Sequence, residues 1–170
     1  ARQAEGRKPE MSNAIRIVVR YLDGQVRKGT TQDFSPNRDR FHLQPLEGGG
    51  AIEVRTSHLK AVFFVQTFEG DSQRQKQRGF VEGPPETTQG KKIAVRFTDG
   101  ELVCGYTLSY TPGRGGFFVT PADAAGNTIR VYVLAEAATE IKAGAAAENL
   151  VRSVLDALSR KKEPRPSSGT

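Results

Sequence analysis

Basic side chains are concentrated near the start of this chain, and their chemistry suits the binding of anions. The chain has 170 residues and a net charge of +6. Residues 14–68 hold eight lysines and arginines against five acidic residues, whereas residues 93–143 hold four against five. The first stretch supplies Arg16, Arg20, Arg27, Lys28, Arg38 and Arg40. Because an arginine can hold a phosphate through two parallel hydrogen bonds and stack on a flat base, we expect an anionic partner to bind there, with Arg38 and Arg40 as the first candidates.

Groups that could carry out catalysis or hold a metal are scarce. The chain has two histidines, His42 and His58, and one cysteine, Cys104. It contains neither Cys-x-x-Cys nor His-x-x-x-His, so the spacing does not favour a zinc site. A nucleophilic cysteine needs a neighbouring base, and the sequence indicates none for Cys104. We therefore predict a protein that is not an enzyme and that uses no metal or cofactor.

An internal repeat organises the chain. Aligning residues 19–45 with the residues 76 positions later gives ten identities in 27 positions. Ordinary composition would give about one or two. The pairs include Asp23 with Asp99 and Gly24 with Gly100. After one extra residue, the alignment places residues 52–54 opposite residues 129–131. We conclude that the chain carries two copies of one structural unit.

Each copy is predicted to be made of short strands. Apolar residues alternate with polar ones in residues 15–21, and an Asp-Gly pair follows, which is typical of a strand entering a hairpin. Further strands are expected over about residues 25–34, from Arg40, and near residues 52–54 and 62–65, with counterparts in the second copy. Short strands in a flat sheet would leave edges exposed, and a small barrel avoids this. We predict a mainly β protein with two tandem small β-barrels and a C-terminal α-helix.

The predicted organisation has six parts. They are a disordered N-terminal segment (1–13), a first barrel (14–68), a polar linker (69–92), a second barrel (93–143), an amphipathic helix (144–162) and a disordered tail (163–170). The helix has an apolar stripe made of Leu150, Val151, Val154, Leu155 and Leu158. Such a stripe needs a surface to cover, and we expect a barrel end or the seam between the copies; a partner protein is the alternative.

Three features indicate where the protein works. No run of about 18 apolar residues could span a bilayer, and the first ten residues have no apolar stretch of the kind found in signal peptides. The single cysteine cannot form an internal disulfide. We predict a cytoplasmic protein without a membrane span.

The stretch from Gly29 to Arg38, GTTQDFSPNR, resembles the second motif of the PilZ domain, Asp/Asn-x-Ser-x-x-Gly after a strand glycine. Asp33 and Ser35 match the motif, and Arg38 stands where the family has glycine. Arg16 and Arg20 have the Arg-x-x-x-Arg spacing of the first motif; on a strand they would lie about 13 Å apart on one face. PilZ domains are bacterial β-barrel receptors for cyclic di-GMP. The resemblance implies that Asp33 and Ser35 join the basic residues in binding this nucleotide.

A second resemblance is to Sm-like barrels, which bind RNA. The Gly-x-x-x-x-Gly spacing occurs at Gly24–Gly29 and again 76 residues later, followed by an aromatic residue at Phe34 and Tyr110. This resemblance implies an SH3-like or Sm-like small barrel that stacks bases on aromatic rings, for which Phe34, Phe41, Phe63 and Phe64 are the candidates.

Three functions follow from these patterns. The leading one is a PilZ-like bacterial regulatory module that senses cyclic di-GMP or acts as a degenerate PilZ adaptor. The second is an Sm-like RNA or DNA binder. The third is a protein–protein adaptor without a small ligand, which docks its partner on the strand at residues 62–65 or on the terminal helix. The sequence leaves the oligomeric state open.

Overall fold

The computed structural model describes residues 14–68, 86–87, 90–122 and 127–162. The predicted N-terminal segment, most of the linker and the tail lie outside these residues. The first part of the chain forms β1 (Ile15–Tyr21), β2 (Val26–Thr31), β3 (Arg40–Pro45), β4 (Ile52–Arg55), the 3₁₀-helix η1 (Thr56–His58) and β5 (Leu59–Val65). The second part forms β6 (Glu86–Thr87), β7 (Gly90–Phe97), β8 (Leu102–Thr107), β9 (Gly116–Pro121), β10 (Thr128–Leu134), the 3₁₀-helix η2 (Ala135–Ala137), β11 (Ala138–Ala143) and the α-helix α2 (Ala145–Lys162).

The two copies of the repeat fold into units of the same topology. In the first unit (residues 14–68) the strands lie in the order β5-β1-β2-β3-β4, and in the second unit (residues 90–143) in the order β11-β7-β8-β9-β10. Even an irregularity is repeated, because the register shifts after Arg20 where β1 meets β5 and before Glu140 where β11 meets β7. Equivalent glycines let the strands bend closely together: a Cβ atom at Gly29 would collide with the carbonyl group of Gln44, and one at Gly105 with that of Thr120.

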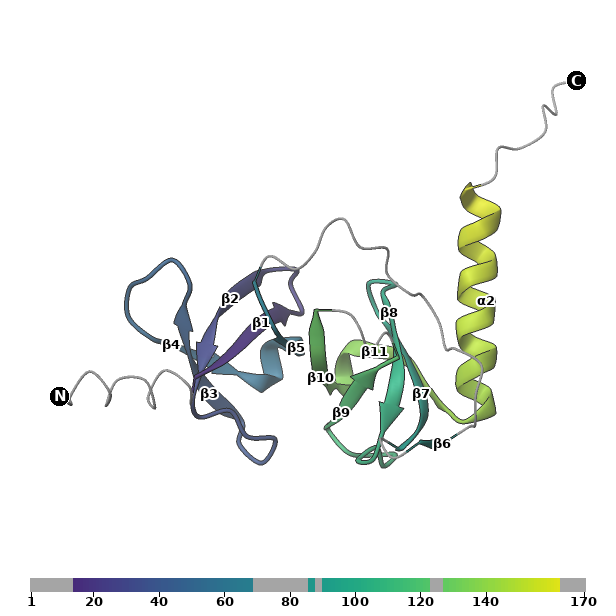
Figure 1. The fold of residues 1–170 in the computed structure, drawn as a ribbon, viewed down its shortest axis with the longest axis horizontal. Helices are drawn as coiled ribbons and strands as arrows, with labels where there is room; N and C mark the ends of the chain where they lie inside the picture. Colours follow the sequence, from purple (N-terminus) through teal and green to yellow (C-terminus); the bar gives the residue numbers. More distant parts are fainter. Residues whose placement is uncertain (1–13, 69–85, 88–89, 123–126, 163–170) are drawn as a thin grey trace, which may run out of the picture.

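The strands of the described residues form one continuous antiparallel sheet and do not close into two separate barrels. The units are joined edge to edge by β5 of the first and β10 of the second, which lie together at the centre of the molecule (Figure 1). The mainly β fold with a C-terminal helix is therefore confirmed, and the predicted closed barrels are corrected. The edge strand β5 of the first unit pairs with β10 of the second, so neither unit has to close into a barrel to cover that edge.

The joining strands contribute to the hydrophobic cores of both units. Val62 of β5 is fully buried in the core of the first unit, where Tyr132 of β10 also packs. Ala61, which points to the other face of β5, is fully buried in the core of the second unit together with Val131 and Val133 of β10. Because successive residues of a strand face opposite sides, each joining strand can serve two cores.

Charged residues stand at the corresponding positions of the two outer strands, β4 and β11. The register of β3 with β4 and of β9 with β10 makes Glu53 the counterpart of Tyr132. The register of β5 and β11 makes Glu140 and Lys142 the counterparts of Ala61 and Phe63. Charges on an edge strand discourage further pairing, so the sequence of these strands limits the sheet to two units.

A buried lysine adds a polar connection across the junction. The Lys60 side chain is only 7% exposed, and its Nζ atom donates to Asp99 Oδ2 at 2.7 Å and also to Glu101. The same ammonium group lies 4.7 Å from the centre of the Phe97 ring. The hydrogen bond from Lys60 lowers the pKa of Asp99. The charge of Lys60 is thereby neutralised by the turn that follows β7 in the other unit.

The structure corrects several predicted boundaries. β7 begins at Gly90 and β6 lies at residues 86–87, both inside the segment predicted as linker. β2 ends at Thr31, earlier than predicted. Residues 52–54 correspond to residues 131–133, because the loop before β10 has three more residues than the loop before β4. Loop length is poorly constrained by an alignment of strands, since a loop tolerates insertions.

The terminal helix packs on the second unit and not on the seam. It contacts β7, β8 and β11 and stands on the side of the second unit that is remote from the first (Figure 1). Among the described residues, no helix combines the length and the apolar character needed to cross a membrane.

Candidate binding face of the first unit

The paired strands β1 and β2 place part of the predicted basic set on one surface. Directly opposite residues of an antiparallel pair point to the same side, and the register pairs Val18 with Lys28 and Arg20 with Val26. Arg16, two residues before Val18, shares that side. The alternate residues of β1, such as Ile17, are buried in the core. We call Arg16, Val18, Val26 and Lys28 the open face; the two basic residues are exposed, Val26 is 48% exposed and Val18 is half-buried.

The basic residues of this surface differ in how their charges are compensated. Arg20 lies 3.8 Å from Glu101 and stacks 5.2 Å from the centre of the Phe63 ring, so its charge has a partner within the protein. Arg27 pairs with the core residue Val19 and so points to the other side of β2, where it lies 6.0 Å from the centre of the Tyr21 ring. Lys28 donates to the carbonyl oxygen of Phe68 at 3.3 Å. Within the described residues, no acidic partner is recorded for Arg16, Arg27 or Lys28, so these charges remain available to a ligand.

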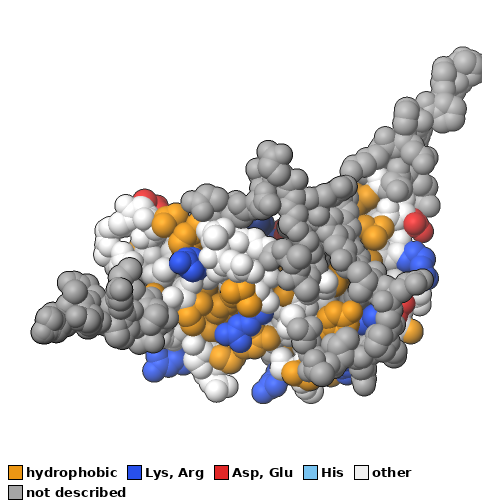
Figure 2. Space-filling view, in the orientation of Figure 1, with side chains coloured by type: hydrophobic (Ala, Val, Ile, Leu, Met, Phe, Trp, Pro, Cys, Tyr) orange, Lys and Arg blue, Asp and Glu red, His pale blue; other side chains and the backbone are white. Residues whose placement is uncertain are grey.

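A groove adjoins the open face. It has a volume of about 490 Å³ and lies where the start of β2 meets the end of β3 and the loop between β3 and β4. Its lining consists of Gln25, Val26, Arg27, Lys28, Leu43, Pro45, Leu46, Glu47 and Ile52. Leu46 is 56% exposed at its rim. Figure 2 shows Lys and Arg side chains standing among hydrophobic ones on the side of the molecule that is in view. The surface thus combines positive charge with apolar area.

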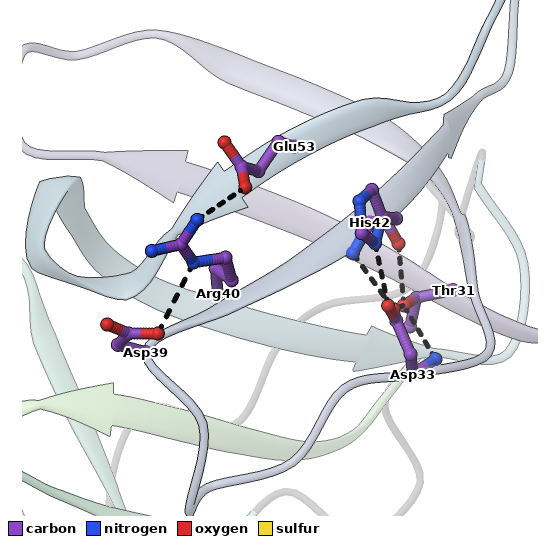
Figure 3. A network of polar contacts seen from close by, with 6 residues as sticks. All are labelled: Thr31, Asp33, Asp39, Arg40, His42 and Glu53. Carbon is purple, nitrogen blue, oxygen red and sulfur yellow. Dashed lines mark hydrogen bonds and ion pairs between the residues drawn. The ribbon is translucent and has the colours of Figure 1, made fainter.

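Arg40, one of the two first candidates, is engaged by acidic neighbours. Its guanidinium group donates to Glu53 Oε2 at 3.0 Å and lies 3.5 Å from Asp39 Oδ1 (Figure 3). Asp39 directly precedes Arg40 in the chain, and Glu53 lies on the neighbouring strand β4. Arg38, the other first candidate, is exposed in the preceding loop, and no acidic partner is recorded for it in the described part of the chain. An anion at Arg40 would have to compete with Glu53, which disfavours this position.

Asp33 and Ser35, the residues singled out by the PilZ resemblance, hold the loop between β2 and β3. Asp33 Oδ1 accepts from the backbone N–H of His42 at 2.8 Å, and Asp33 Oδ2 lies 2.8 Å from His42 Nδ1 (Figure 3). Partial burial works to raise the pKa of Asp33, but the hydrogen bonds from His42 and Thr31 outweigh it and lower that pKa. Ser35 Oγ accepts from the backbone N–H of Asn37 at 3.2 Å.

The second unit shows that this use of Asp33 belongs to the fold. There, Ser109 occupies the equivalent position, and its Oγ accepts from the backbone N–H of Phe118 at 3.1 Å. Thr31 and its counterpart Thr107 each donate to the strand carbonyl opposite, at 2.8 Å. In both units the side chain at this position accepts a hydrogen bond from the backbone of the strand that follows the loop. The Asp33 carboxylate therefore stabilises the fold, and this role does not require a ligand.

The aromatic residues proposed for base stacking lie mostly inside the molecule. Phe41 and Phe64 are 1% and 2% exposed, and Phe63 is half-buried. The Phe34 ring is partly buried and makes edge contacts with Phe41, Phe64, Phe118 and Tyr132. Phe34 therefore packs against aromatic rings of both units at their junction. These rings stabilise the junction and present little stacking surface.

The described residues contain no group of three or more His, Cys, Asp and Glu side chains that could hold a metal ion. The described residues define a class of protein: a β-sheet protein of two like units, the first of which has exposed basic residues on one side of β1 and β2. The chain belongs to a family of unknown function, DUF6982, whose model matches residues 13–145. The match spans both units and stops where α2 begins. No curated protein and no solved structure matched the chain.

Sequence reasoning identified the difference in charge between the two copies but did not predict how differently this surface is buried in them. The repeat pairs Val26 with Leu102 and Lys28 with Cys104. Val26 and Lys28 are exposed, whereas Leu102 and Cys104 are half-buried. The signal was present in the alignment, because a lysine at a position that is a cysteine in the other copy indicates different surroundings. The ion pairs of Arg40 and Asp33 had no comparable signal.

Proposed function

We propose that this protein is a non-enzymatic binding module whose first unit receives an acidic partner protein on the open face. The observation that carries the proposal is the pair of exposed cations, Arg16 and Lys28, which lie beside exposed apolar side chains and have no acidic partner recorded in the described part of the chain. By contrast, Arg20, Arg40 and Lys60 are matched by acids. Positive charge left without an internal partner attracts an anionic one and speeds its association.

The shape of the surface favours a protein over a nucleotide. The residues predicted to bind cyclic di-GMP fall on two parts of the first unit. Arg16, Arg20 and Lys28 lie on β1 and β2, whereas Asp33, Ser35 and Arg40 belong to the loop and strand that follow. A nucleotide needs convergent polar groups in a concave site, and Asp33 is already bonded to His42. A protein partner can instead use a broad surface of mixed polarity.

Charge reversal tests this proposal. Poly-glutamate serves as the probe, and its affinity is measured by fluorescence anisotropy at low salt. The double variant Arg16→Glu, Lys28→Glu should bind at least about tenfold more weakly than the natural sequence, because two cationic contacts are each worth on the order of 1 kcal/mol. Binding by the natural sequence should also weaken as salt is added.

A matched control carries the same change of charge elsewhere. Lys142→Glu, Arg152→Glu alters exposed residues of β11 and α2 and should retain most of the affinity. Equal losses in both double variants would contradict a specific face. Calorimetry with cyclic di-GMP should give no heat; binding of this nucleotide that depends on Arg16 and Lys28 would overturn the proposal in favour of the PilZ-like function.

A further inference from the structure

The second unit shows what covers the counterpart of the open face. Helix α2 lies across the outer side of β7 and β8 and buries Ala147, Leu150 and Val151 against Ala94. Leu102 and Cys104 are partly buried at the same contact, together with Val154 and Leu155 of the helix. The apolar stripe of the helix and this side of the sheet therefore form a small third core.

An ion pair fixes the helix at its first turn. Lys92 of β7 is nearly buried, with 4% of its side chain exposed, and its Nζ atom donates to Glu148 Oε2 at 2.8 Å. Glu148 lies in the first turn of α2, where a negative charge is also favoured by the helix dipole. The hydrogen bond from Lys92 lowers the pKa of Glu148. A cation beneath an acidic residue thus sets the position of the helix along the strands.

The open face has the same pattern of residues, and no helix among the described residues covers it. The shared register of β1 with β2 and of β7 with β8 places Arg16 at the position of Lys92, Val18 at that of Ala94, Val26 at that of Leu102 and Lys28 at that of Cys104. A cation and two apolar residues are retained, and one further cation is added. Arg16 is nevertheless exposed and Val18 half-buried, whereas their counterparts Lys92 and Ala94 are buried. Val26 is 48% exposed, and its counterpart Leu102 is half-buried.

In the described residues the chain leaves the two units in different ways. After β11, Gly144 adopts a left-handed conformation with φ of 65° and turns the chain into α2. After β5, the chain instead stays beside the second unit. The N–H of Gln66 donates to the carbonyl oxygen of Asn127 at 2.9 Å, and the N–H of Thr67 donates to Asn127 Oδ1 at 3.0 Å. These bonds hold residues 66–67 beside the second unit, and the carbonyl oxygen of Phe68, the last described residue of this stretch, then accepts from Lys28 of the open face at 3.3 Å.

We infer that the open face binds an amphipathic helix of the partner protein, seated across β1 and β2 as α2 is seated across β7 and β8. The helix carries an acidic residue over Arg16 and a second one near Lys28, and it presents small and branched apolar side chains to Val18 and Val26. This inference rests on the proposed function, and it adds the conformation and the charge pattern of the partner segment.

A peptide of residues 145–159 is the probe for this helix; it leaves out the basic end of α2 and has a net charge of −1, from Glu148 and Asp156 against Arg152. An isolated helix of this length is only marginally stable in water, so its circular dichroism should show increased helicity when it binds the full chain. The intact protein keeps its own α2 in place, because a tethered helix outcompetes a free one at moderate concentration. The peptide should therefore bind at the first unit.

A charge swap identifies the contact. Arg16→Glu should weaken binding of the natural peptide at least about tenfold, and the peptide with Glu148→Lys should bind this variant at least about tenfold better than it binds the natural protein. Restored binding by the swapped pair requires direct contact between the two positions.

Two further outcomes separate this inference from the proposed function. If poly-glutamate binding depends on Arg16 and Lys28 but the peptide neither binds nor gains helicity, the helix is overturned and the acidic partner stands. If neither probe binds, both are overturned. Binding of the peptide without any effect of the charge swap would also contradict the inferred seat.

Discussion

Ala61→Glu should destabilise the protein by about 4 kcal/mol or more, because it places an unpaired carboxylate in a buried apolar site. Ala61 is fully buried in the core of the second unit although it belongs to a strand of the first. A loss of this size would show that the two units share their cores and are not merely connected. Urea denaturation followed by circular dichroism measures the free energy of unfolding.

The reciprocal substitution is the control. Glu140 occupies the equivalent position on β11, an outer strand of the sheet, so Glu140→Ala should change the free energy of unfolding by no more than about 0.5 kcal/mol. The same pair of amino acids would then have opposite consequences at equivalent positions. A small effect of Ala61→Glu would contradict the structure of the junction.

Leu150→Glu should increase the reactivity of Cys104 on the order of a hundredfold at pH 8. Burial beneath α2 raises the pKa of the Cys104 thiol to about 11, so very little thiolate is present near neutral pH. A charge in place of Leu150, which is 8% exposed, should release the helix and let the pKa fall toward about 8.5. The rate of labelling by a thiol reagent measures this change.

Arg152→Glu controls for the altered charge of the helix. Arg152 is exposed and donates to the side chain of Asn149, so this variant should leave Cys104 slow to react. Equal labelling of the Leu150→Glu variant and the natural protein would contradict the covering role of α2. Circular dichroism should show that the β-sheet persists in both variants.

Much of the fold could be predicted because it depends on local sequence patterns that occur in both copies of the repeat. The alternation in β1, the Asp-Gly turn at Asp23 and the matching turn in the second copy specify hairpins by short-range chemistry. The pairing of β5 with β10 was not predicted, since apolar residues on both faces of β5 are compatible either with a closed barrel or with a shared strand. The contrast between Ala61 and Glu140 distinguishes these possibilities, but only when the register is known.

The site was harder to predict, because the sequence does not show which charged residues pair with residues that are distant along the chain. Arg40 meets Glu53 and Asp33 meets His42 only after β3 has folded against its neighbours. Arg16 and Lys28, by contrast, were among the predicted ligand residues and lie together on an exposed surface. Their significance comes from comparing them with Lys92 and Cys104, and it therefore depends on the structure of both units.

The most direct test of the open face compares the same position in the two units. Lys28→Cys in a Cys104→Ala background reports on the open face, and the natural Cys104 reports on the covered one. We predict that the thiol introduced at position 28 reacts with a thiol reagent at pH 8 at least about a hundredfold faster than Cys104, in line with an ordinary thiol pKa and free access. Equally slow reaction at both positions would show that the face of the first unit is covered, and it would contradict the binding surface proposed for it.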